Sequence, residues 1–132
     1  MKFEKPVLHA AKISDACSLS KLAEKTFREA FAKLNKKQDF EKYVGESFTE
    51  NKIKSEISDR ESFFYIAKLE EKWVGYAKLC HGPTPECVRP LPAIELSRLY
   101  SLQQYWGCGI GLSLIEKCIE HACNNAFKSI WL

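Results

Sequence analysis

Three glycines at alternate positions, Gly107, Gly109 and Gly111, constrain this chain more than any other feature. They stand between the β-rich run AIELSRLYSL and the helical pattern IGLSLIEKCIEHA. The first turn of a helix has unpaired N–H groups and the positive end of the helix dipole, and glycine allows both positive φ and close approach of a ligand. The segment therefore predicts a strand, a glycine turn and a helix start that can hold a phosphate group on residues 107–112.

The spacing of these glycines excludes two common phosphate-binding motifs. A P-loop needs a lysine directly after its last glycine, and Leu112 follows Gly111 here. The dinucleotide-binding pattern GxGxxG needs its third glycine at the position that Leu112 occupies. Two interpretations stay open on spacing alone: a cradle for a pyrophosphate, or a glycine turn that only lets a helix pack on a sheet.

Length and composition indicate a single domain, residues 1–132, because 45% of the 132 residues are hydrophobic and can bury a core. The net charge is only +3 and no long Lys/Arg run is present, so we expect no nucleic-acid partner. No apolar run approaches the roughly 18 residues of a membrane span, and the first residues lack an apolar signal segment. We therefore expect no membrane partner and a cytoplasmic location. The six cysteines form no CxxC pair, which predicts free thiols, a buried Cys118 and no metal site.

Hydrophobic periodicity predicts the elements of the first half of the chain. Residues 7–14 are typical of a short strand. Apolar side chains at steps of three and four predict a long amphipathic helix over residues 19–34, with Phe27 and Phe31 in the core. A weaker helical pattern over residues 39–58 predicts two short helices, interrupted at Gly45 and Thr49.

The second half changes to a strand pattern. The runs SFFYIAKL (62–69) and KWVGYAKLC (72–80) predict a hairpin that turns at Glu70-Glu71. Residues 81–92 contain four of the five prolines and predict a loop, and residues 93–102 predict another strand.

The glycine turn is followed by a helix that ends near Asn124-Asn125, and the residues SIWL (129–132) predict the start of a last strand. One face of this helix is expected to hold Ile110, Leu114, Ile115, Cys118, Ile119 and Ala122. The order is then β, α, α, β, β, β, α, β, which predicts one layered α/β (α+β) fold.

At this point the residues carry a resemblance. The segment ELSRLYSLQQYWGCGIGLSLIEKCIEHA…KSIWL resembles the acetyl-CoA-binding motif of the GCN5-related N-acetyltransferase (GNAT) superfamily, in which [Q/R]xxGx[G/A] joins the fourth strand to a helix. One register begins at Trp106, where the family usually has Gln or Arg, and starts the helix near Gly109. A second register begins at Gln104 and also satisfies the pattern.

The similarity extends upstream. The runs TFREAF, YVGESFTENKIKSEI, FFYIA and WVGYAKL resemble bacterial polyamine acetyltransferases of the spermidine/spermine kind, so that the resemblance covers nearly the whole chain. It implies the GNAT acyl-CoA N-acyltransferase fold, a mixed and mostly antiparallel sheet flanked by helices.

The resemblance also implies an activity and its residues. It implies an N-acetyltransferase that moves an acetyl group from acetyl-CoA to a small-molecule primary amine, with a polyamine as one candidate acceptor. Pantetheine is expected along the backbone of Leu99, Tyr100 and Ser101, one amide of which polarises the thioester carbonyl. The pyrophosphate is expected on the amides of a contiguous run, which comprises Gly107, Cys108, Gly109, Ile110, Gly111 and Leu112.

Acidic residues supply the remaining candidates. Glu95 is the candidate general base, on a strand face that it is expected to share with Ser97, Leu99 and Ser101. The alternative is an ordinary half-exposed residue, paired to Arg98 or to a lysine. The resemblance places Glu24, Glu29 and Glu46 on the acceptor side, where they would attract a cationic polyamine or simply form a solvated face.

Members of the family continue after IWL with a helix and two strands, which supply an Asn that contacts CoA and a Tyr that acts as general acid. This sequence ends at Leu132, so the comparison implies a chain that lacks those residues. The alternative function is therefore an acyl-CoA-binding or interaction protein without turnover. An uncovered SIWL edge also leads us to expect a homodimer.

Overall fold

A five-stranded sheet forms the centre of the computed structural model, which describes residues 5–31, 33 and 37–132. The strands follow one another across the sheet in chain order, and they are β1 (Val7–Ala10), β2 (Ser62–Leu69), β3 (Lys72–Cys80), β4 (Ala93–Ser101) and β5 (Ser129–Trp131). The first four strands pair antiparallel, and β5 joins β4 in parallel. The mixed, mostly antiparallel sheet expected from the sequence is therefore confirmed.

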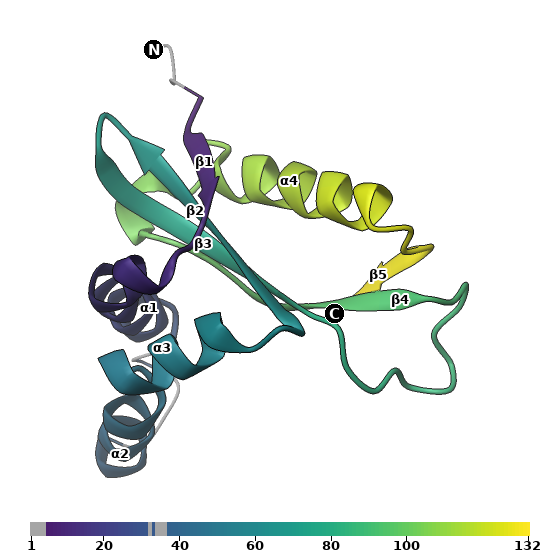
Figure 1. Ribbon diagram of the computed structural model, residues 1–132. Helices are drawn as coiled ribbons and strands as arrows, with labels where there is room; N and C mark the ends of the chain where they lie inside the picture. The colour runs from purple at the N-terminus through teal and green to yellow at the C-terminus, as the bar shows by residue number, and fades with distance from the viewer. Residues whose placement is uncertain (1–4, 32, 34–36) are drawn as a thin grey trace.

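Helices cover both faces of this sheet (Figure 1). One face carries α1 (Ala16–Phe31), α2 (Lys37–Ser47) and α3 (Glu50–Ser58), whose buried side chains meet Phe64, Ile66 and Tyr76 of the sheet. The other face carries α4 (Ile110–Asn124), which packs on Val74, Ala77 and Leu79 among others. The sheet thus separates two apolar clusters, and the layered α/β arrangement follows from burying both of its faces.

Local chemistry explains several element boundaries. Glu70 and Glu71 both have positive φ, 48° and 69°, which is the backbone shape that a two-residue hairpin turn needs. The Thr49 hydroxyl accepts a hydrogen bond from the Lys52 amide at 3.2 Å and so caps the start of α3. Gly45 lies inside α2, so the interruption expected there is wrong, and the helical run is interrupted only at Phe48 and Thr49, between α2 and α3.

The N-terminal boundaries differ slightly from the expected ones. The first strand ends at Ala10, four residues before its expected end, and a short 3-10 turn follows at Ile13–Asp15. The long helix α1 begins at Ala16, three residues before Leu19, the first apolar position of the predicted stripe, while Leu34 at its expected end lies outside the described residues.

The helix α4 buries a narrower stripe than the sequence pattern predicted. Ile110, Leu114, Cys118 and Ala122 are buried, but Ile115 and Ile119 are 36% and 50% exposed. Each of the two isoleucines lies about 100° around the helix from the buried residue before it, which turns it away from the sheet. Burial raises the pKa of the Cys118 thiol to about 11, and the buried free thiol expected there is confirmed.

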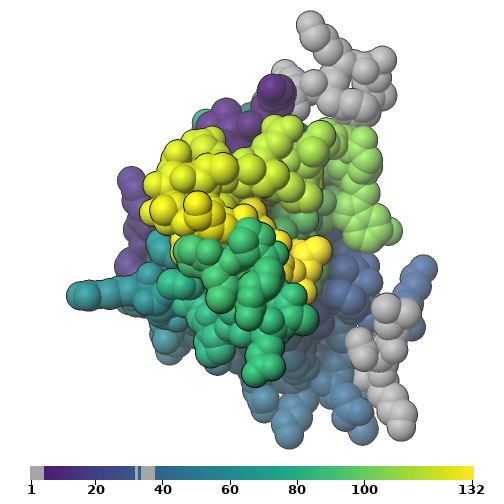
Figure 2. Space-filling model, turned by 90° about the vertical axis from the view of Figure 1, so that its right-hand side faces the viewer, coloured from purple at the N-terminus to yellow at the C-terminus, as the bar shows by residue number. Residues whose placement is uncertain are grey.

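The proline-rich loop that follows β3 lies against β5. The Lys128 amide donates a hydrogen bond to the Pro92 carbonyl at 2.7 Å, and the Ser129 hydroxyl donates one to the Pro90 carbonyl at 2.8 Å. Figure 2 faces this end of the molecule, with the loop in green in front of the yellow C-terminal residues. Among the described helices none is both long and apolar enough to cross a bilayer.

Candidate functional site

The strands β4 and β5 pair over only part of their length. The parallel pairs run from Ala93↔Ser129 to Glu95↔Trp131 and then stop. From Leu96 to Ser101 the β5 side of β4 has no strand partner within the described part of the chain. An edge of this kind presents peptide N–H and C=O groups with which an extended ligand can pair.

A bulge bends β4 next to this free edge. Lys78 pairs with Arg98 but Leu79 pairs with Leu96, so Ser97 is an extra residue between them. As a result Leu96 and Leu99 both pack on the α4 side of the sheet, and Glu95 lies on the opposite side from Leu99. The expectation that Glu95 shares a face with Leu99 and Ser101 is therefore wrong, because it assumed unbroken alternation along the strand.

A partly buried ionic cluster holds the bulged strand to α3. The Arg98 guanidinium donates two hydrogen bonds to the Glu56 carboxylate, at 2.8 and 3.0 Å, and the Lys78 Nζ lies 3.6 Å from the same group. Burial is the largest single influence and acts to lower the pKa of Arg98, but the hydrogen bonds and charge of Glu56 together with the contact to Tyr76 outweigh it, and the pKa is raised. Arg98 is therefore the partner of Glu56, and its alternative pairing with Glu95 is not observed.

The glycine turn that follows β4 needs glycine at two positions for backbone reasons. Gly107 has φ +81° and Gly109 has φ +86°, a region that other residues rarely adopt. Gly111 lies outside that region, and a Cβ built on it would meet no described atom within 4 Å. Nothing in the described chain requires glycine at position 111, whereas a ligand that approaches the backbone closely would require it.

Several amides at the start of α4 have no acceptor in the part of the chain that the structure describes. The first helical hydrogen bond runs from the Ser113 amide to the Gly109 carbonyl at 3.0 Å. The amides of Ile110, Gly111 and Leu112 precede it and donate to no acceptor among the residues described. They stand at the positive end of the helix dipole, and the helix starts where the register beginning at Trp106 expects it.

Trp106 has a structural role in this turn. Its indole Nε1 donates a hydrogen bond to the Ser101 carbonyl at 3.0 Å, and the side chain is 52% exposed. The bond ties the glycine turn to the end of β4. Trp106 stands where the resemblance leads us to expect a polar residue, and its hydrogen bond fixes the loop.

A pocket of about 300 Å³ joins the strand to the turn. It is lined by residues of α1, of β4 and of the turn, namely Ala30, Leu99, Tyr100, Ser101, Trp106 and Gly111. We call it the β4 pocket. Leu99, Tyr100 and Ser101, where pantetheine is expected, thus lie beside Gly111, which belongs to the expected phosphate cradle. The other residues of that cradle belong to the same turn and helix start, and they are Gly107, Cys108, Gly109, Ile110 and Leu112.

Glu95 does not line the β4 pocket. It is half-buried near the other end of β4, opposite Trp131, at the last pair before β4 and β5 separate. No ion pair of Glu95 is found among the described side chains.

Gly75, for which the sequence pattern predicted no role, determines how close α4 lies to the sheet. A Cβ on Gly75 would lie 2.9 Å from the Ile110 Cγ2 and 2.9 Å from the Tyr100 carbonyl oxygen. The start of α4 therefore rests directly on β3. An isolated glycine within a strand is the signal that points to such a close approach.

Two of the three acidic residues expected on the acceptor side have partners elsewhere in the protein. Glu24 lies 3.6 Å from Arg28, and Glu29 accepts a hydrogen bond from the Gln103 amide at 2.8 Å. Glu46 is exposed on α2. None of the three lines the β4 pocket.

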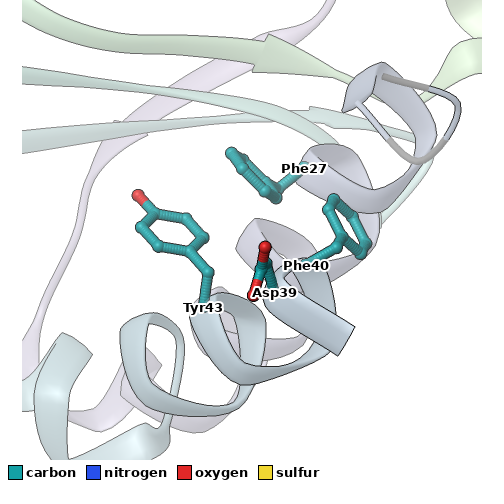
Figure 3. A pocket seen from close by; sticks show the side chains of 4 residues that line it. All are labelled: Phe27, Asp39, Phe40 and Tyr43. Carbon is teal, nitrogen blue, oxygen red and sulfur yellow. The ribbon is translucent and has the colours of Figure 1, made fainter. Parts of the chain in front are cut away.

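A second pocket of about 340 Å³ lies between α1 and α2 and is lined by Phe27, Asp39, Phe40 and Tyr43 (Figure 3). We call it the aromatic pocket. Phe27 packs against the core as predicted but also forms a wall of this pocket. The pocket could not be predicted from the periodicity that placed Phe27 in the core, because Asp39 and Tyr43 come from a different helix.

The fold and the turn at the start of α4 define a class of protein. The sequence model of the acetyltransferase (GNAT) family matches residues 20–132, and the chain belongs to this family.

Relatives agree with this assignment. An uncharacterized N-acetyltransferase of Lactobacillus delbrueckii subsp. lactis is 30% identical over 112 residues, which are 84% of this chain and 64% of the relative. An uncharacterized N-acetyltransferase of Mycobacterium tuberculosis is 25% identical over 120 residues, 91% of this chain and 72% of the relative. The chain thus spans about two thirds of the length of these proteins.

Solved structures share the fold. The PaiA N-acetyltransferase of Thermoplasma acidophilum, in complex with coenzyme A, superposes with a TM-score of 0.73 at 20% identity and covers 92% of this chain and 75% of that one. An aminoglycoside acetyltransferase from an uncultured soil metagenomic sample has the same TM-score and identity, with 98% and 80% covered.

Proposed function

We propose that this protein is an acetyl-CoA-dependent N-acetyltransferase that acetylates a primary amine. One observation carries the proposal: the free edge of β4 leads, through a glycine turn, to the unpaired amides at the start of α4. Membership of the acetyltransferase family and the coenzyme A in the Thermoplasma structure support it.

The geometry suits each part of acetyl-CoA. The amides of Ile110, Gly111 and Leu112 would hold the pyrophosphate, helped by the helix dipole. The peptide groups of Leu99 to Ser101 would pair with the pantetheine amides, and Gly111 leaves room for the phosphate. A peptide N–H of β4 would polarise the thioester carbonyl as negative charge develops on its oxygen.

The reaction needs a neutral amine. The amine nitrogen forms a bond to the acetyl carbon, the C–S bond breaks, and CoA leaves as a thiol once a proton reaches the sulfur. We assign deprotonation of the amine to Glu95, directly or through water, because it is half-exposed where β4 and β5 separate and its carboxylate has no ion pair among the described residues.

Two finer expectations stay predictions. A polyamine is the acceptor that the upstream resemblance favours. A homodimer is the expected assembly, and light scattering at micromolar concentration tests it, since the mass of a single chain would contradict it.

Release of CoA thiol from acetyl-CoA tests the activity, measured with and without a panel of primary amines. We expect release that depends on the amine, with formation of the corresponding acetamide. If CoA raises the melting temperature but no amine raises thiol release, the protein is an acyl-CoA-binding protein and the transferase proposal is wrong.

A further inference from the structure

The aromatic pocket, defined above by Phe27, Asp39, Phe40 and Tyr43, differs in character from the β4 pocket. Figure 3 shows the Phe27 ring of α1 facing the side chains from α2. The Phe27 ring centre lies 5.6 Å from that of Phe40 and 5.1 Å from that of Tyr43. The Phe40 and Tyr43 rings therefore both pack against Phe27, and the three rings line the pocket together with the Asp39 side chain.

The described charges around this pocket pair with one another rather than with Asp39. Arg28 lies over the Phe40 ring at 5.9 Å, but Glu41 accepts two hydrogen bonds from it, at 2.7 and 2.9 Å, and Glu24 lies 3.6 Å away. The Asp39 carboxylate is exposed and has neither a hydrogen bond nor an ion pair within the described ranges. The pocket thus has one carboxylate that no described cation neutralises.

Aromatic rings beside a carboxylate favour an organic cation. The faces of aromatic rings attract alkylammonium groups, and a carboxylate at the rim adds Coulomb attraction. A neutral apolar group would gain from the rings but not from Asp39, and an anion would be repelled by it.

The aromatic pocket adjoins the β4 pocket through Tyr100. The Phe27 ring centre lies 6.5 Å from that of Tyr100, which lines the β4 pocket. The two pockets thus lie on either side of this ring contact, and a molecule long enough to pass around it would reach both.

We propose that the aromatic pocket binds a second, non-reacting ammonium group of the acceptor, held by Asp39 and the rings of Phe27 and Tyr43. The preferred acceptor is then a diamine whose two nitrogens are joined by an apolar spacer. This inference rests on the proposed function, because the reacting amine must lie at β4.

Kinetics with matched amines test the subsite. We expect kcat/KM for hexamethylenediamine to exceed that for heptylamine, its isosteric monoamine, by about tenfold. Asp39→Asn and Tyr43→Leu should reduce this preference to within about twofold, because each removes one source of attraction. Glu50→Gln, which neutralises an exposed carboxylate at the start of α3 outside the pocket, is the control and should retain the preference. Tyr43→Phe, which keeps the ring, should restore the preference that Tyr43→Leu loses.

Direct binding supplies a readout that does not need turnover. Hexyltrimethylammonium cannot be acetylated, and we expect it to bind the CoA-saturated protein about fivefold more weakly after Asp39→Asn or Tyr43→Leu. Equal binding to the wild type and both variants, or no binding to the wild type while CoA still binds, overturns the subsite and leaves the transferase proposal intact. Failure of CoA itself to bind overturns both.

Discussion

At the scale of single residues, the glycines of this protein are needed for different reasons. Gly107 and Gly109 provide positive φ, Gly75 provides contact between β3 and α4, and Gly111 has neither role. The alternate spacing in the sequence predicted a ligand-binding turn but could not separate these roles. The separation needs φ values and neighbouring atoms, which depend on the tertiary structure.

Glu95→Gln tests the assigned base. The substitution keeps the size of the side chain and removes its ability to accept a proton, so we expect the acetylation rate near neutral pH to fall by roughly 100-fold. The rise in melting temperature on adding CoA should match that of the wild type, since Glu95 does not line the β4 pocket. An undiminished rate with the best amine would assign Glu95 a structural role only.

Because His121 is buried in the folded protein, we expect the free energy of unfolding to fall in mild acid. Its Nδ1 lies 2.6 Å from the Tyr65 hydroxyl, and burial, with a smaller contribution from Lys117, lowers its pKa below the ordinary 6.5. Below about pH 6.5 the unfolded chain therefore binds a proton that the folded chain does not, so that the free energy of unfolding falls as the pH drops. This stability is fully present above pH 6.5.

Urea unfolding between pH 7.5 and about 5 measures this effect. We expect the wild type to lose stability relative to His121→Gln, with a slope of at most about 1.4 kcal/mol per pH unit. The difference between the two proteins isolates His121 from the other titrating groups. Parallel curves would show that His121 does not titrate differently in the folded state.

At the scale of elements, β4 combines a bulge, a free edge and an ionic connection to α3. Its existence and extent could be predicted from the run AIELSRLYSL, which begins and ends within a residue of the observed strand. The bulge at Ser97 could not, because it appears only in the register against β3. Glu56, which anchors Arg98, is 42 residues away in sequence and lies on a different element, so no local pattern connects the two.

Gly75→Ala tests the contact between β3 and α4. The added methyl group would lie 2.9 Å from the Tyr100 carbonyl, and backbone cannot move aside cheaply. We expect a loss of about 1–3 kcal/mol in the free energy of unfolding and weaker CoA binding, because the start of α4 must shift.

The matched control is Gly45→Ala in α2, where the new methyl group meets nothing described within 4 Å. Alanine favours the helix, so this variant should gain up to about 1 kcal/mol and bind CoA as the wild type does. Chemical denaturation measures the free energy of unfolding of the wild type, Gly75→Ala and Gly45→Ala. Equal stability of Gly75→Ala and the wild type would contradict the close contact between β3 and α4.

At the scale of the whole molecule, the sheet separates two helical layers that contribute differently to the site. The helix α4 contributes its N-terminal amides, and α1 and α2 contribute the aromatic pocket on the other face (Figure 1). The layered fold could be predicted from periodicity and from the resemblance to acetyltransferases. The aromatic pocket could not, because Phe27 and Asp39 belong to helices that meet only in the folded chain.

CoA is expected to bind with its pyrophosphate at the start of α4. The most direct test measures the melting temperatures of the wild type and of Gly111→Glu, each with and without CoA. Without ligand, Gly111→Glu should melt slightly higher, because a carboxylate in the first turn of α4 suits the helix dipole and replaces a glycine. CoA at 100 times its Kd should stabilise the wild type by about 2.7 kcal/mol, a shift of several degrees, and should not shift the variant, whose side chain places bulk and negative charge against the phosphate. An equal CoA-induced shift in both proteins would contradict the claim.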